Sequence, residues 1–199
     1  MDSGEYRYQF VAGNLALDFV NTVAYRADPG KRSDHLQRAQ DVRRWANDAQ
    51  LPDRAAINSG PPMGTEALRR ILVVREQLFA VFHALATDDP IRADTLARVG
   101  IALHECCAKR RLSVEGPQVR WAWRPGARCK DYLLYPVLNA AIDLLTSEAR
   151  GLVRQCEDAG CGWLFLDRSN ARRRRWCSMA DCGNRNKART YYRREWGMT

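Results

Sequence analysis

The sequence has no segment typical of a membrane or exported protein. Its most apolar stretch, residues 133–145, is interrupted by Tyr135, Pro136, Asn139 and Asp143, so it does not predict a transmembrane helix. The first residues do not pair a basic start with an apolar run, as a signal peptide would. We therefore expect a soluble cytoplasmic protein with no membrane partner, in which the seven cysteines are thiols or metal ligands.

Recognisable catalytic signatures are also missing. The sequence contains no P-loop, no G-x-S-x-G motif and no G-x-G-x-x-G motif. Its three histidines, His35, His83 and His104, are not spaced as a metal triad. We therefore expect the protein not to be an enzyme and to have no catalytic residues.

Acidic residues are scarce near the end of the chain, where the charge is mostly of one sign. The 199 residues carry a formal net charge of +9, which favours an anionic partner. Twelve lysines and arginines but only five acidic residues lie within 150–199, a net charge of +7, whereas the first 149 residues contribute only +2. The basic surface is therefore local, as a separate binding module requires.

Four of the seven cysteines form two matched pairs in this basic segment. Cys156 and Cys161 are separated by four residues, as are Cys177 and Cys182, and fifteen residues lie between the pairs. Four thiolates suit a tetrahedral zinc ion and leave no position for water. The spacing therefore predicts one structural Zn²⁺ held by these four cysteines. The remaining cysteines show no such pattern and are expected to be packed thiols: Cys106, Cys107 and Cys129.

The hydrophobic pattern predicts a mostly α protein with minor β structure, of the α+β class. Apolar residues repeat at helical spacing most clearly over 65–86, which predicts a helix with one buried face. An alternation of period two over 117–125 predicts a strand with one buried face. Further helices are expected at 15–25, 33–50, 92–111, 132–156 and 183–196, further strands at 6–11 and 163–167, and a loop at 51–65.

These elements divide into two domains. Residues 1–150 are expected to form a helical N-terminal regulatory or sensor domain, and residues 151–199 a small four-cysteine zinc module that binds nucleic acid. The helix predicted at 132–156 runs into Cys156 without a strong break signal. We therefore expect this helix to tether the module rigidly to the N-terminal domain.

Positive charge surrounds the second cysteine pair. An arginine run precedes Cys177, and the helix predicted after Cys182 carries two basic stripes with Tyr191 between them. Such a surface suits phosphate contacts and entry into a groove, with zinc fixing the angle between run and helix, although most charge runs are solvated helix faces. Tyr192 and Trp196 are expected to pack against the module. The residues expected to bind nucleic acid are Arg172, Arg173, Arg174, Arg175, Arg185, Lys187, Arg189, Arg193 and Arg194.

Three segments resemble a known family. The run 176–185, WCSMADCGNR, and the segment LFLDRS at 164–169 are similar to the CGNR zinc-finger family, named after residues 182–185. The run 13–22, GNLALDFVNT, is similar to the start of the domain that precedes this finger in such proteins. The resemblance spans nearly the whole chain and implies a bacterial stress-induced transcription regulator whose finger binds DNA.

Arg75 interrupts the apolar stripe of the helix predicted at 65–86. A buried guanidinium needs an anionic or carbonyl partner, and Asp18 on the first helix is a candidate. Two interpretations stay open. One is an internal salt bridge that fixes helix packing, and the other is a polar pocket in which Arg75, Asn14, Asp18 and Asn21 bind a small acidic effector.

Together these features predict a zinc-finger protein that binds DNA and regulates transcription, with an N-terminal domain that senses a ligand or forms a homodimer. Phosphate recognition by arginines does not distinguish DNA from RNA, so an RNA-binding protein is one alternative. An enzyme with its site in the N-terminal domain and the finger as a targeting module is another. A zinc module for protein contact is disfavoured, because such a surface would carry mixed charges.

Overall fold

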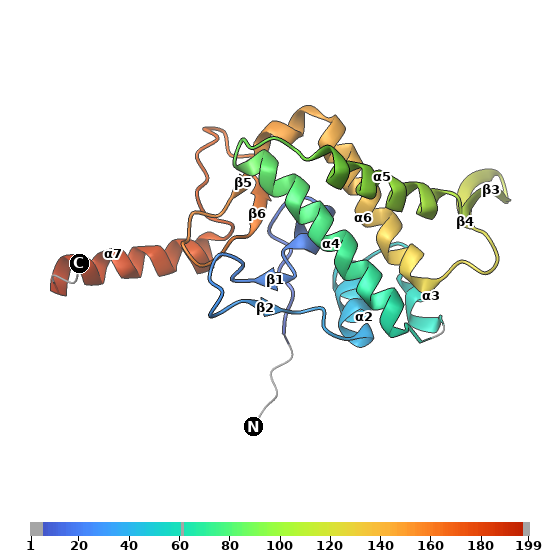
Figure 1. The fold of residues 1–199 in the computed structure, drawn as a ribbon, viewed down its shortest axis with the longest axis horizontal. Coiled ribbons are helices and arrows are strands. Elements are labelled where there is room, and N and C mark those ends of the chain that lie inside the picture. Colours follow the sequence, from blue (N-terminus) through green and yellow to red (C-terminus); the bar gives the residue numbers. More distant parts are fainter. Residues whose placement is uncertain (1–5, 61, 197–199) are drawn as a thin grey trace, which may run out of the picture.

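The computed structural model describes residues 6–60 and 62–196, without the side chains of Cys129 and Trp196. It shows a helical body from which a helix and a hairpin project at opposite ends (Figure 1). The helices are α1 (Leu15–Val20), α2 (Ala39–Asp48), α3 (Arg54–Ser59), α4 (Thr65–Ala86), α5 (Ala93–Cys107), α6 (Cys129–Thr146) and α7 (Asn184–Trp196), with the short turns η1 (Glu148–Leu152) and η2 (Met179–Gly183). The strands are β1 (Val23–Ala24), β2 (Ser33–Asp34), β3 (Arg110–Glu115), β4 (Gln118–Trp123), β5 (Val153–Gln155) and β6 (Leu164–Leu166).

These strands form three antiparallel pairs of neighbours in the sequence, and no larger sheet is present among the described residues. The mostly helical fold with minor β structure predicted from the sequence is confirmed. Within the described ranges, none of the helices is both long enough and apolar enough to cross a membrane.

The core of the body is built around α4, which begins and ends at the predicted residues. Its Ile71, Leu78 and Phe82 side chains are fully buried, and the helix packs against α1, α5 and α6. Removing each such side chain from water contributes about 1.5–3 kcal/mol to folding. The regular apolar repeat over 65–86 therefore identified the helix at the centre of the fold.

The N-terminal segment differs from the prediction because two short strands interrupt it. The first helix ends at Val20 rather than at residue 25, since Val23 and Ala24 pair with residues 33–34. The same pairing delays the second helix to Ala39, so its predicted start at residue 33 was wrong. The polar and turn-forming residues around 26–32 form the loop that closes this two-stranded pair.

Two further predictions in this region were wrong. Residues 6–11 are not a strand, because no strand lies beside them in the described part of the chain. Tyr8 instead anchors the segment, and its hydroxyl donates to the carbonyl of His35 at 2.8 Å. The expected loop at 51–65 contains the short helix α3, which buries Ile57 against the core.

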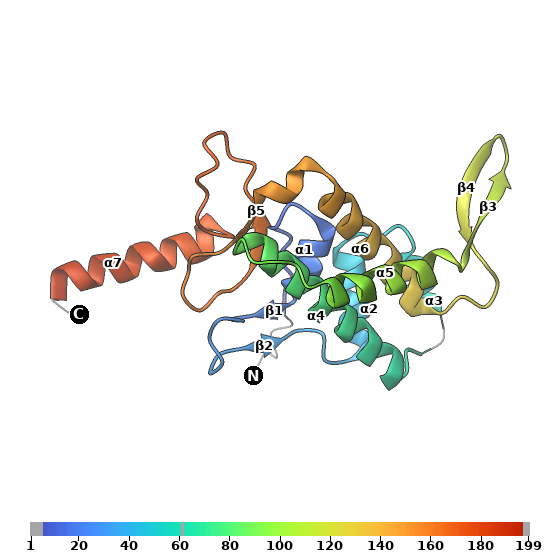
Figure 2. The ribbon, with the colours of Figure 1, turned by 45° about the horizontal axis from the view of Figure 1, so that its top comes forward.

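The strand predicted at 117–125 is β4, but the prediction that one face is buried was wrong. β4 pairs with β3 alone, and Val119 and Trp121 are exposed. The hairpin extends beyond α5 and α6 into solvent (Figure 2). The alternation of period two thus predicted the strand correctly, although Val119 and Trp121 are not covered by any described part of the chain.

The prediction of a continuous helix into the finger was also wrong. α6 ends at Thr146, because Ser147 adopts an extended backbone and its hydroxyl donates to the carbonyl of Leu144 at 3.0 Å. The turn η1 and the strand β5 then lead to Cys156. A packed interface, not a helix, therefore connects the finger to the body.

This interface shares one continuous hydrophobic core with the body. The Asn21 side chain donates to the carbonyl of Leu164 at 2.8 Å and accepts from its N–H at 2.9 Å. Gly162 adopts a φ of +69°, and a Cβ at that position would lie only 2.9 Å from the Cβ of Arg26. The chain beside the first cysteine pair therefore needs glycine to approach the body this closely.

Arg75 is buried, as predicted, but its partner is Asp34 and not Asp18. The guanidinium donates to both carboxylate oxygens of Asp34, at 2.7 and 2.6 Å, and to Glu76 at 2.9 Å. Burial alone would lower the pKa of Arg75, but the bonds to Asp34 outweigh it and the pKa is raised. Asp34 reaches this position through the pairing of β1 with β2, which the sequence pattern did not predict.

Candidate zinc centre and nucleic-acid surface

The two cysteine pairs meet in one buried cluster. The Sγ atoms of Cys156, Cys161, Cys177 and Cys182 all lie within 4.8 Å of one another. The Sγ atom of Cys177 lies 3.7 Å from that of Cys161 and 3.6 Å from that of Cys182. In a regular tetrahedron with edges of that length the centre is about 2.2–2.3 Å from each corner, close to a zinc–sulfur bond. The four cysteines therefore form a metal-binding site that suits zinc.

The start of α7 is attached to the loop of the first cysteine pair through Asp158. This carboxylate is buried and accepts from Arg185 Nε at 2.6 Å and from Arg189 Nη1 at 2.9 Å. Burial alone would raise the pKa of Asp158, but the two arginine bonds outweigh it and the pKa is lowered. Arg185 also donates to the Sγ atom of Cys182 at 3.0 Å. One ion-pair network thus joins the cluster, the loop and the helix.

The arginine run before Cys177 is divided between the interior and the surface. The Arg174 guanidinium lies 4.4 Å from the centre of the Phe165 ring and donates to the carbonyls of Val11 and Trp176. Arg174 therefore ties the finger to the body, a role that its sequence position does not reveal. Arg175 pairs with Glu157 at 2.5 Å on the surface.

The helix α7 projects away from the body (Figures 1 and 2), and its first two turns contact the finger through Arg185 and Arg189. All side chains from Lys187 to Glu195 are exposed. The prediction that Tyr192 packs against the module was therefore wrong, and the prediction for Trp196 lies outside the described side chains. Five of the expected nucleic-acid ligands are exposed and make no ion pair with any described residue: Arg172, Arg173, Lys187, Arg193 and Arg194.

A groove of about 590 Å³ separates the arginine run from α7. Arg175 and Trp176 line one side of it, and Lys187, Tyr191 and Arg194 line the other. The helix presents its other basic stripe, which begins with Arg185 and Arg189, toward Asp158. The run and the helix therefore face each other, as the predicted mechanism requires, but Arg174 and Arg185 serve the fold itself.

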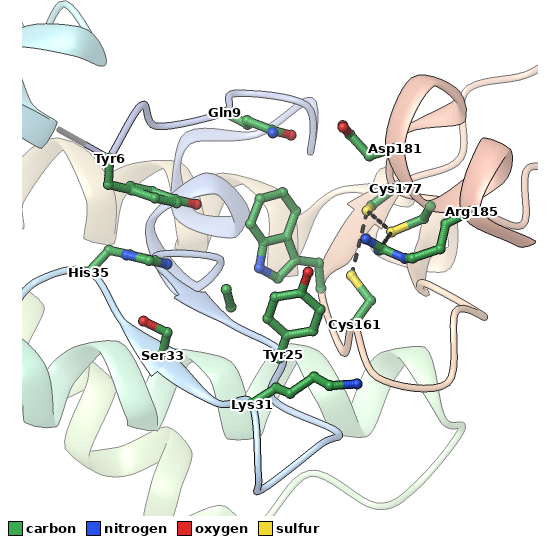
Figure 3. A pocket seen from close by; sticks show the side chains of 13 residues that line it. Tyr6, Gln9, Tyr25, Lys31, Ser33, His35, Cys161, Cys177, Asp181 and Arg185 are labelled. Atoms are coloured by element: carbon green, nitrogen blue, oxygen red, sulfur yellow. Dashed lines mark hydrogen bonds between the residues drawn. The ribbon is translucent and has the colours of Figure 1, made fainter. Parts of the chain in front are cut away.

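A second cavity, of about 290 Å³, lies where the body meets the cysteine cluster. The rings of Tyr6 and His35 stack at a centroid distance of 3.4 Å, and the Trp163 indole donates to the carbonyl of Val23 at 2.9 Å. Burial raises the pKa of Tyr6 to about 12 and lowers that of His35, so both rings are uncharged at neutral pH. Figure 3 shows the side chains that surround this space, among them Tyr6, Tyr25, Ser33, His35, Cys161 and Arg185.

The four residues expected to bind an acidic effector line neither of the two cavities described above. Asn14 caps α1 by accepting from the N–H of Ala16 at 2.8 Å. Asp18 accepts from the N–H of Ala12 at 3.0 Å, and burial raises its pKa to about 7. Asn21 is used by the finger interface and Arg75 by its salt bridge. Each of these side chains is thus engaged by the fold.

Two family models match successive parts of the chain. A model of the ABATE family, described as "Putative stress-induced transcription regulator", matches residues 13–148. A model of the CGNR zinc finger matches residues 153–195 and so includes all four cysteines. The resemblance drawn from 13–22, 164–169 and 176–185 is therefore confirmed. No match was found among curated proteins.

Replacing Asp158 tests whether its carboxylate fixes the direction of α7. We expect Asp158→Asn to keep its metal, because all four thiols remain, while trypsin cleaves within α7 several times faster than in the native protein. The neighbouring exposed change Glu157→Gln is the control and should leave the cleavage rate unchanged. Equal cleavage rates for Asp158→Asn and the native protein would show that the carboxylate does not hold the helix.

Proposed function

This chain belongs to the ABATE family and carries a CGNR zinc finger, and we propose that it regulates transcription by binding duplex DNA through α7 and the arginine run. The observation that carries the proposal is the groove between Arg175 and α7, which is bordered by basic side chains and is open to solvent. We propose binding, not catalysis, as the activity.

A helix that enters a groove of DNA must be exposed to solvent, and α7 meets this requirement. Its 13 residues span about 20 Å, and a helix of this length is only marginally stable in water without a packing partner. The major groove of duplex DNA is about 12 Å wide and accepts one α-helix. A basic helix that stands clear of the body can therefore enter that groove, while the flanking phosphates offset its positive charge.

The basic residues of α7 and of the arginine run are proposed to contact different parts of the DNA. We assign Lys187 and Arg194, which line the protein groove from the α7 side, to phosphates of one DNA strand. Arg172 and Arg173 contact phosphates on the other side of the DNA major groove. Arg189 and Arg193 continue the second stripe of the helix. One zinc ion, bound by four thiolates and so without an open position, supports these elements as a structural metal. Tyr191 is exposed between the stripes, where it can contact bases or sugars.

Removing two groove-side charges tests the proposal. We expect the double variant Lys187→Ala with Arg194→Ala to bind duplex DNA at least tenfold more weakly. The slope of log K against log salt should fall by about 2, roughly 1 for each lost phosphate contact. Fluorescence anisotropy across a salt series measures both quantities.

The control removes the same charge elsewhere. Arg92 and Arg98 are exposed on the body near the start of α5, and changing both to alanine should leave affinity and slope unchanged. Structured RNA as a competitor separates DNA from RNA binding. Stronger competition by RNA than by duplex DNA, or equal losses in the two double variants, would contradict the proposal.

The cavity at the cysteine cluster favours a second candidate function, the sensing of a small molecule. We propose that it accepts a flat, neutral aromatic compound. The aromatic rings of Tyr6, Tyr25, His35 and Trp163 line it, and the positive charges of Lys31 and Arg185 are balanced by Asp181 and the adjacent thiolates. This balance favours a neutral effector over the acidic one expected from Arg75. Because Arg185 also holds Asp158, a ligand here would contact the network that directs α7.

Calorimetry with 2-naphthol tests this cavity. We expect binding by the native protein and at least tenfold weaker binding by Tyr6→Ala, because the ring wall of the cavity is lost. Tyr191→Ala, which removes a tyrosine from exposed α7, is the matched control and should bind like the native protein. Tighter binding of 2-naphthoate than of 2-naphthol would speak for an acidic effector, and the absence of any binding would refute the site.

A further inference from the structure

The outer part of the β3–β4 hairpin carries four exposed apolar side chains on one face, while Trp123 at the base of that face packs against Tyr132 and Tyr135 of α6. Leu112 and Val114 are 63% and 74% exposed, and Val119 and Trp121 are 66% and 58% exposed. The register places Leu112 opposite Trp121 and Val114 opposite Val119, so all four side chains lie on the same face. A two-stranded hairpin alone in water is marginally stable at best. A further strand beside the exposed part of the hairpin would therefore stabilise it.

The outer edge of β3 is open for such pairing. Arg124 donates its N–H to the carbonyl of Lys109 at 2.8 Å, so the pair of residues 109 and 124 is hydrogen-bonded within the hairpin. Hydrogen-bonded and non-hydrogen-bonded pairs alternate along an antiparallel ladder. The N–H and C=O groups of Leu112 and Val114 therefore point away from β4, toward solvent.

The sequence of β3 is complementary to itself in the antiparallel direction. In a two-fold pairing centred on Ser113, Leu112 of one copy lies opposite Val114 of the other, and Arg111 lies opposite Glu115. The outward-facing main-chain groups then meet each other, and two pairs of opposite charges form. Centring β4 on Arg120 in the same way would place two arginines opposite each other, so β3 is the favoured edge.

We propose that two copies of this chain associate through β3, forming a four-stranded antiparallel sheet. Leu112 and Val114 then have apolar neighbours on both sides, and the apolar face becomes continuous across the two hairpins. Arg111 makes no ion pair with any described residue, and Glu115 reaches Arg120 only at 4.0 Å, so both are available for the partner. Because β3 and α7 lie at opposite ends of the molecule (Figure 1), the α7 helices of both copies lie away from this interface. The interface does not depend on DNA binding.

Charge exchange at Arg111 and Glu115 tests the pairing. Sedimentation of the full chain without DNA should show a monomer–dimer equilibrium. Arg111→Glu and Glu115→Arg should each weaken the dimer at least tenfold, because each places like charges opposite one another twice. The double exchange should restore the native dissociation constant, and an equal mixture of the two single variants should form a heterodimer. Arg92→Glu on the body is the control for charge alone.

The sedimentation results either support the proposed β3 dimer or contradict it. Restoration by the double variant and by mixing supports it, and neither result follows from misfolding of a single variant. A native protein that stays monomeric at all concentrations, or a dimer that both single variants leave unchanged, would overturn it. Since no DNA is present, these results stand apart from any failure of the DNA-binding experiment.

Discussion

The position of α7 depends on one buried carboxylate. Asp158 lies between the first two cysteines and receives Arg185 and Arg189 from the first turns of the helix. The four thiolates fix the ends of both cysteine loops, and this ion pair fixes the helix that leaves the second loop. Without it, nothing else among the described residues attaches α7 to the finger beyond its first turn. The orientation of the basic helix α7 therefore rests on an acidic side chain, Asp158.

The finger and the body form a single packed unit. Asn21 completes the main-chain bonding of β6, Trp163 bonds to β1, and Arg174 reaches back to Val11. These contacts connect the body to the cysteine cluster through packing, without a continuous helix. The cavity between Tyr6 and the cluster lies at this same junction, so a molecule bound in it would contact both the body and the finger.

The sequence predicted the features that depend on local pattern. The apolar repeat gave α4 its bounds, and the spacing of the cysteines identified the metal cluster. The features that depend on distant partners were not predictable in this way. Arg174 is one of four consecutive arginines, and only the fold shows that its side chain turns inward over Phe165. The alternation in β4 indicated a strand but not whether another surface covers it. Asp34 could not be assigned to Arg75 before the pairing of β1 and β2 was known.

We propose that metal coordination holds the basic groove in the form that binds DNA. The most direct test compares duplex-DNA binding by the zinc-loaded protein, the zinc-stripped protein and the protein after zinc is restored, with circular dichroism to follow the helical body. We predict that binding is lost with the metal and regained with it, while most of the helical signal persists. Equal affinity of the stripped and loaded forms for duplex DNA would show that the metal does not hold the groove in its binding form.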